Sequence, residues 1–194
     1  AGIGGGSADA GALLRAVRQA NGAVSDGVDW LVLAGELGAD VPVCFEARSQ
    51  WMTGSGDRLV EIAGGGPPLA AVLVNPMAAV PADKTARVFR ALDARSLDAG
   101  YAAPPAPRLS GLPSLLDFVR AHGNDLACAA ETVVPETGAG LSALAALPGC
   151  AYTGVSGAGP TCFGIFSDEA AAKAGRAVIA SKHPAWWVVD VRLG

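Results

Sequence analysis

The residues best suited to chemistry are a glycine-rich stretch at the start of the chain. It reads Ala-Gly-Ile-Gly-Gly-Gly-Ser-Ala-Asp-Ala, and a helical pattern follows at once. Glycine lets a backbone approach a ligand closely, and a helix N-terminus offers unpaired N–H groups and a positive dipole end. A di- or triphosphate is the expected ligand, and the Ser7 hydroxyl could also bind a phosphate-bound Mg²⁺. The candidate phosphate-binding residues are Gly2, Ile3, Gly4, Gly5, Gly6, Ser7 and Ala8.

The same stretch also has an explanation without a ligand. It matches neither the P-loop pattern nor the dinucleotide-binding fingerprint, and Ser7 or Asp9 could simply cap a helix over residues 8–21. Spacing alone favours the two explanations about equally. The chain starts on this loop with neither a methionine nor a strand before it, so we expect it to be the later part of a longer protein.

Asp40 is the second candidate for chemistry. The apolar pattern predicts a helix over 26–37, with Ser25 or Asp26 at its start, and then a strand beginning at Val41. Asp40 would then meet the negative end of a helix dipole, which does not favour a carboxylate. A catalytic role would explain it, and so would a turn in which the carboxylate bonds nearby N–H groups. The residues alone favour the turn.

Composition excludes several classes of function. The 194 residues carry a net charge of −4 without a basic face, which argues against nucleic-acid binding. No apolar run reaches 18 residues, so no membrane span is expected. The four cysteines are scattered without a C-x-x-C pair and only two histidines are present, which argues against zinc. Unpaired cysteines favour a reducing, cytoplasmic setting.

The clearest linker is the Gly-Gly-Gly-Pro-Pro run at 64–68, so we expect two domains, 1–66 and 67–194. The first should contain a pair of short strands within 50–62. In the second, we expect an α+β layer of the ferredoxin-like type, an antiparallel sheet with helices on one face. Its predicted strands are 69–74, 152–155, 161–166 and 186–191, and its predicted helices are 83–92, 112–122, 124–130, 140–147 and 169–181.

A second glycine turn, Ser156-Gly157-Ala158-Gly159, lies between two predicted strands. The plain interpretation is a hairpin turn. Two glycine-rich turns from two domains could also line one cleft, and clefts between domains are favoured ligand sites.

Taken together, five stretches in this order resemble the GHMP small-molecule kinases. They are residues 1–10, 37–43, 74–76, 124–126 and 156–163. The resemblance covers essentially the whole chain. It implies a partial ribosomal-S5-like α/β domain, whose start is missing, followed by a ferredoxin-like domain. Within the family, the aspartate segment and Asn124-Asp125-Leu126 are most similar to members that phosphorylate the 2-hydroxyl of 4-diphosphocytidyl-2-C-methyl-D-erythritol.

The resemblance also implies roles for residues. Asp40 would be the base that accepts the proton of the substrate hydroxyl. The loop from Gly2 to Ala8 would hold the phosphates of ATP, with Ser7 near Mg²⁺. Gly157, Ala158 and Gly159 would help to close the cleft. The expected partner is this small-molecule substrate, with no nucleic acid and no membrane, and the protein would be a monomer or homodimer.

The sequence departs from the family at four points. The residues that hold the cytosine ring are absent, and Asp57 stands at a position where a glutamate is common. A lysine carried by the family's first motif has no counterpart here, and Ala8 stands where a second serine is usual. Two alternatives therefore stay open. One is another GHMP kinase acting on homoserine, mevalonate or a sugar. The other is a remnant that binds nucleotide without transferring phosphate.

Overall fold

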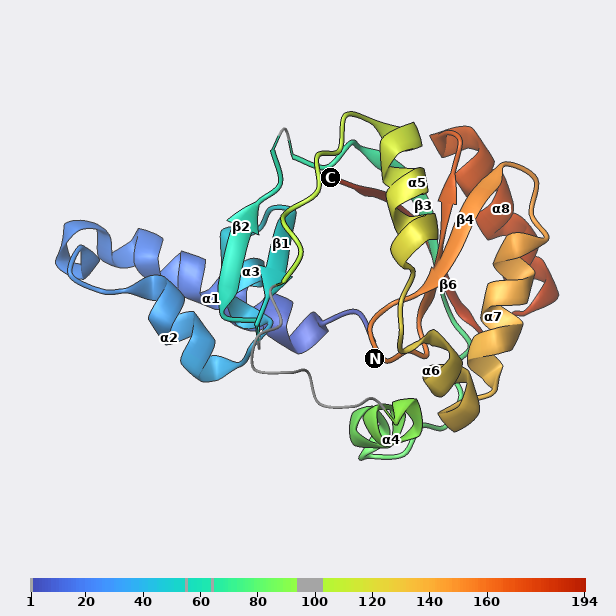
Figure 1. Cartoon of the computed structure of the whole chain (residues 1–194), viewed down its shortest axis with the longest axis horizontal. Helices are drawn as coiled ribbons and strands as arrows, with labels where there is room; N and C mark the ends of the chain where they lie inside the picture. The colour runs from blue at the N-terminus through green and yellow to red at the C-terminus, as the bar shows by residue number, and fades with distance from the viewer. Residues whose placement is uncertain (1, 55, 64, 94–102) are drawn as a thin grey trace. The chain divides into compact units, whose positions relative to one another are not determined.

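The computed structural model describes residues 2–54, 56–63, 65–93 and 103–194. They divide into two compact units, which are described separately (Figure 1). Unit 1 contains residues 2–3, 67–93 and 110–193, and unit 2 contains residues 4–54, 56–63, 65–66, 103–109 and 194.

Unit 1 is built on a four-stranded antiparallel sheet with the strand order β4-β5-β3-β6. The strands are β3 (Leu69–Asn75), β4 (Cys150–Val155), β5 (Cys162–Phe166) and β6 (Trp187–Leu193). β3 is one of the two inner strands, and Val72 pairs with Gly164 on one side and Asp190 on the other. Its continuous apolar run fits this inner position, because Ala71, Val72 and Val74 are all buried.

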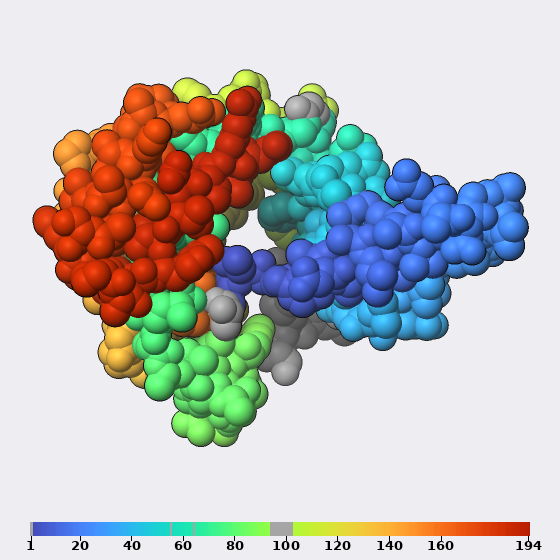
Figure 2. Space-filling view, turned by 180° about the vertical axis from the view of Figure 1, so that it is seen from behind, coloured from blue at the N-terminus to red at the C-terminus, as the bar shows by residue number. Residues whose placement is uncertain are grey.

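Five helices complete unit 1 within the described chain. They are α4 (Lys84–Leu92), α5 (Leu112–His122), α6 (Ala127–Val133), α7 (Glu136–Ala145) and α8 (Glu169–Lys182). α7 and α8 pack on the sheet, and Figure 1 shows both on the same side of it. α8 also packs beside β6, and their atoms form one continuous surface in Figure 2. The expected ferredoxin-like layer is confirmed.

The core of unit 1 lies between the sheet and these helices. Phe166, Leu144 and Ile179 are its largest fully buried side chains. Trp186 lies just before β6 and packs against this core, whereas Trp187, the first residue of the strand, is 40% exposed.

The described residues of unit 2 form three helices, a 3₁₀ turn and a two-stranded sheet. The helices are α1 (Gly5–Asn21), α2 (Trp30–Leu37) and α3 (Val41–Glu46), and the turn η1 is Gly22–Ser25. The strands β1 (Gln50–Thr53) and β2 (Arg58–Glu61) pair antiparallel, which confirms the predicted strand pair. The buried core is small and comprises Leu14, Ala34, Val41 and Phe45.

Two of the elements predicted for unit 2 differ from the structure. Residues from Val41 form α3 and not a strand, because the five-residue apolar run at 41–45 fits either structure and Pro42 in the first turn favours a helix. α2 begins at Trp30 and not near Asp26. Its cap is Asp29, whose carboxylate accepts from the N–H groups at 31 and 32 at 3.2 and 3.1 Å.

In the described part of the chain, no helix combines the length and the apolar character needed to cross a membrane. Across those same residues, no three His, Cys, Asp or Glu side chains gather into a metal-binding group.

Candidate functional site

The glycine-rich stretch ends in an uncapped helix N-terminus. α1 begins at Gly5, with Gly4 in the left-handed conformation at φ 65°. The first intrahelical bond runs from the Ala8 N–H to the Gly4 carbonyl at 2.9 Å. The N–H groups of Gly5, Gly6 and Ser7 precede it and have no partner within the helix. Among the described residues, no side chain caps this end, so the expected capping by Ser7 or Asp9 is wrong.

This end of α1 suits an anion. A side chain at Gly4, Gly5 or Gly6 would meet no atom within 4 Å, so the space around the turn is open. The first helical turn contains no acidic residue, and Asp9 follows it. A 17-residue helix therefore directs its positive dipole end and its unpaired N–H groups into open space. Ser7 is half-buried in the first turn and offers a hydroxyl there.

Asp40 occupies the N-cap position of α3 and is exposed. The sequence pattern predicted this carboxylate at the negative end of the preceding helix, whereas the structure places it at the positive end of α3, which favours a carboxylate. Its side chain forms no capping bond to α3. The carboxylate acts electrostatically on Cys44, one turn further on. Burial raises the pKa of the Cys44 thiol, the charge of Asp40 raises it further, and Arg15 lowers it.

Close packing of α1 on α3 fixes the helix that carries Asp40. Gly11 of α1 faces the backbone of Cys44 and Phe45, and a Cβ at Gly11 would lie 2.7 Å from the Cys44 carbonyl carbon. Arg15, one turn later on α1, donates from Nη1 to the carbonyl oxygens of Cys44 and Phe45. The uncapped helix end and Asp40 thus belong to two helices that are locked together within unit 2.

The second glycine turn, residues 156–160, joins β4 to β5 in unit 1, which confirms the predicted hairpin. Gly157 and Gly159 adopt φ 53° and 63°, a region that favours glycine. The Ser156 N–H donates to the Thr161 carbonyl, and the Gly159 N–H donates to the Ser156 carbonyl, both at 2.9 Å. These bonds close the turn.

Two side chains from elsewhere in unit 1 hold the carbonyl groups of this turn. The Asn124 side-chain amide donates to the carbonyl oxygens of Val155 and Gly157, both at 2.9 Å. Lys84 Nζ donates to the Ala158 carbonyl at 3.0 Å and also to the Gly159 carbonyl. Asn124 belongs to one of the stretches that resemble the family, whereas no signal in the sequence pointed to Lys84.

The other sequence signatures of unit 1 meet at the same turn. Asn75, at the end of β3, is buried and donates from Nδ2 to Thr161 Oγ1 at 2.9 Å. Its Oδ1 accepts from the Met77 N–H at 2.8 Å. Gly2 also lies there, since a Cβ at Gly2 would be 2.9 Å from the Gly159 carbonyl oxygen. Unit 1 thus brings together the first residue described, the Asn-Pro signature and the second glycine turn.

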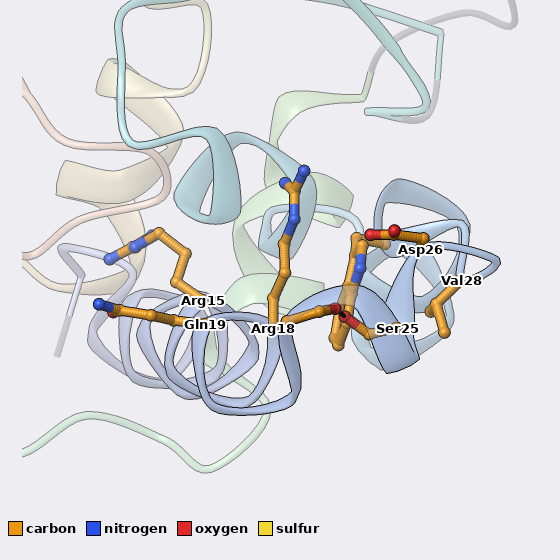
Figure 3. Close-up of a pocket in the computed structure, with 8 residues that line it drawn as sticks. Arg15, Arg18, Gln19, Ser25, Asp26 and Val28 are labelled. Carbon is orange, nitrogen blue, oxygen red and sulfur yellow. Dashed lines mark hydrogen bonds between the residues drawn. The ribbon is translucent and has the colours of Figure 1, made fainter.

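A separate pocket lies at the other end of α1 (Figure 3). Its volume is about 410 Å³, and Figure 3 shows Arg18 standing between Arg15 and Gln19 on one side and Ser25 and Asp26 on the other. It begins about 15–20 Å along the helix from the glycine-rich end, given the rise of a helix. Its arginines already have partners, because Arg15 bonds the end of α3 and Arg18 lies over the Phe45 ring. The pocket is therefore distinct from the glycine-rich end of α1.

Comparison with known proteins identifies the family. The family profile described as "GHMP kinases C terminal" matches residues 113–185, all within unit 1. A solved structure titled as 4-(cytidine 5'-diphospho)-2C-methyl-D-erythritol kinase covers 100% of this chain and 67% of its own chain, with a TM-score of 0.71 and 28% identity. The chain belongs to the GHMP kinase family.

Curated relatives share more of the sequence. A 4-diphosphocytidyl-2-C-methyl-D-erythritol kinase of Methylobacterium radiotolerans is 43% identical over 196 residues, and this match covers 100% of this chain and 66% of the relative. The kinase of the same name from Rhodospirillum rubrum is 40% identical, and there the match covers 100% of this chain and 61% of the relative. The chain thus spans somewhat less than two thirds of the length of these relatives.

Proposed function

We propose that this chain is part of a kinase that transfers the γ-phosphate of ATP to the 2-hydroxyl of 4-diphosphocytidyl-2-C-methyl-D-erythritol, a step of isoprenoid precursor synthesis. The observation that carries the proposal is the uncapped, acid-free N-terminus of α1 in a chain 43% identical to a kinase of that name. We further propose that units 2 and 1 correspond to the N-terminal and C-terminal domains of the family, divided near residue 66. The setting would be cytoplasmic, which the four free cysteines favour.

In this proposal the residues of the chain hold the phosphates of ATP and the substrate hydroxyl in place and stabilise their charge. The N–H groups of the loop from Gly2 to Ala8 would hold the phosphates, because phosphoryl transfer depends mainly on positioning and electrostatic stabilisation. Asp40 would accept the proton of the substrate hydroxyl as that oxygen bonds to the γ-phosphorus and the bond to the β-phosphate oxygen breaks. Gly157, Ala158 and Gly159 would contribute to closing the site.

The donor groups fit Mg²⁺ held mainly by phosphate. Mg²⁺ usually keeps several waters and binds one or two protein oxygens besides substrate phosphates. Ser7 supplies a hydroxyl beside the unpaired N–H groups, without a cluster of acidic ligands among the described residues. Bound there, Mg²⁺ would neutralise charge on the phosphates.

The test is ADP release from Mg²⁺-ATP in the presence of 4-diphosphocytidyl-2-C-methyl-D-erythritol. Asp40→Asn should lower turnover about 10²- to 10⁴-fold, the usual contribution of a positioned base. Glu36→Gln, which removes an exposed carboxylate from α2, is the matched control and should leave turnover unchanged.

Other outcomes separate the alternatives. Turnover only with homoserine, mevalonate or a sugar would keep the family and reject this substrate. ATP binding without turnover on any of them would indicate a nucleotide-binding remnant. Full activity in Asp40→Asn would reject the proposed base.

A further inference from the structure

Lys84 contacts the second glycine turn, although it lies outside the five stretches that resemble the family. Its Nζ donates to the carbonyl oxygens of Ala158 and Gly159, which lie 74 and 75 positions further along the chain. Hydrogen bonds from a charged donor are about twice as strong as neutral ones. One ammonium group therefore fixes two consecutive peptide carbonyls.

The position of Lys84 on α4 explains why its side chain reaches the turn. Lys84, Val88 and Leu92 are spaced at i, i+4 and i+8, so they share one face of the helix. Val88 is fully buried and Leu92 packs against the core of unit 1, which fixes that face inward. Lys84 is accordingly half-buried, and this burial lowers the pKa of its ammonium.

Together with the bonds from Asn124, the bonds from Lys84 restrain the backbone conformation of the turn. Asn124 holds the carbonyl oxygens of Val155 and Gly157, and Lys84 holds the next two. Carbonyl oxygens are the negative ends of the peptide dipoles, and they repel a phosphate that approaches them. A turn that comes close to a polyphosphate must therefore have its carbonyl groups directed to other partners.

The Gly159 carbonyl also links this contact to the start of the phosphate loop. A Cβ at Gly2 would lie 2.9 Å from that oxygen and 3.1 Å from Thr161 Oγ1. Gly2 therefore packs directly against the Gly159 carbonyl group, to which Lys84 donates a hydrogen bond. Movement of this carbonyl would disturb both the turn and the first residue of the loop within unit 1.

We propose that Lys84 is a positioning residue for nucleotide binding. By bonding the carbonyl oxygens of Ala158 and Gly159, it holds the turn in the conformation that accepts the phosphates of ATP and places a positive charge beside it. This inference rests on the proposed role of the turn in a kinase site. It assigns Lys84 no contact with the reacting atoms.

The test compares three variants of the 194-residue chain with the wild type. Lys84→Met keeps the length of the side chain and removes its charge and its hydrogen-bond donors. Lys84→Arg keeps the charge and the donors. Lys173→Met removes the charge of an exposed lysine on α8 and is the matched control. One measurement is amide hydrogen exchange at Ser156 and Gly159, whose N–H groups are bonded within the turn. The other is the Kd of Mg²⁺-ATP by calorimetry.

In Lys84→Met we expect exchange at the turn to become about tenfold faster and the Kd of Mg²⁺-ATP to rise about tenfold, while exchange in β3 stays unchanged. Lys84→Arg should restore both values to within about threefold of the wild type, because it keeps the donors and the charge. Lys173→Met should behave as the wild type in both measurements.

Exchange at the turn that is unchanged in Lys84→Met would overturn the proposal. Faster exchange with an unchanged Kd would also overturn it, because Lys84 would then support the fold alone. A wild-type chain that binds no Mg²⁺-ATP would instead refute the proposed function of this chain. In that case the exchange rates would still decide whether Lys84 holds the turn.

Discussion

Gly11 should be the most size-sensitive position of unit 2, because α1 meets the backbone of α3 there. A Cβ at Gly11 would lie 2.7 Å from the Cys44 carbonyl carbon, 2.8 Å from the Phe45 nitrogen and 2.9 Å from the Cys44 oxygen. Ordinary contact begins at 3.4 Å, so Gly11→Ala must push the two helices apart by several tenths of an ångström. These are backbone atoms, and no change of rotamer relieves the overlap.

The magnitude follows from two opposing effects. Overpacking costs roughly 1–3 kcal/mol, whereas replacing glycine by alanine inside a helix contributes roughly 0.5–1 kcal/mol of stability. The expected net loss for Gly11→Ala is therefore roughly 0–2.5 kcal/mol, centred on about 1 kcal/mol. Gly35→Ala is the matched control, because a Cβ at Gly35 of α2 would meet nothing within 4 Å. That variant should become more stable by roughly 0.5–1 kcal/mol.

Native-state amide hydrogen exchange is the suitable assay, because it reports on each unit separately. Exchange in α1, α2 and α3 should be several-fold faster in Gly11→Ala than in the wild type and slower in Gly35→Ala, since about 1 kcal/mol corresponds to about a fivefold change. Exchange in β3 and β5 of unit 1 should stay constant. If the α1–α3 amides exchange as slowly in Gly11→Ala as in Gly35→Ala, the packing argument is wrong.

Three further predictions test the site and the core. Gly6→Glu puts an acid into the first turn of α1, so thermal melting should show a gain in stability of roughly 0.3–1 kcal/mol. Calorimetry should show a rise of about tenfold in the Kd of Mg²⁺-ATP. Gly6→Gln is the neutral control, and tighter ATP binding in Gly6→Glu would contradict the anion site. Asn124→Asp removes the amide donor to two carbonyl oxygens without changing shape, so unit 1 should lose roughly 1–3 kcal/mol, and an unchanged unfolding midpoint in urea would refute the role given to this amide. Burial raises the pKa of the Cys162 thiol from 9.0 to about 12. Iodoacetamide at neutral pH should therefore alkylate exposed Cys128 and spare Cys162, as read by mass spectrometry, and equal labelling of the two in the folded protein would contradict the burial. The same shift means that the unfolded thiol ionises first, so its contribution to stability is complete below pH 9.0 and falls as the pH rises toward 12.

The sequence by itself determined the features that depend on local pattern. The apolar run of β3, the turn residues between β4 and β5, and the helical spacing of α4 and α8 all predicted the observed elements within a few residues. Glycine followed by a helical pattern predicted a helix directly after the glycine-rich stretch, although α1 begins at Gly5 and has no side-chain cap. These signals are local because strand and helix periodicity, and the backbone freedom of glycine, act within one segment.

The tertiary structure decided what depends on partners far away in sequence. The residues from Val41 suited either a strand or a helix. In the structure they form the helix α3, which packs closely on α1 at Gly11. The bonds from Lys84 to the turn, and from Asn75 to Thr161, join positions 74 to 86 residues apart. Such contacts leave no periodic pattern in the sequence, because a side chain that bonds a remote backbone group is fixed only once the sheet and its helices have brought the two together.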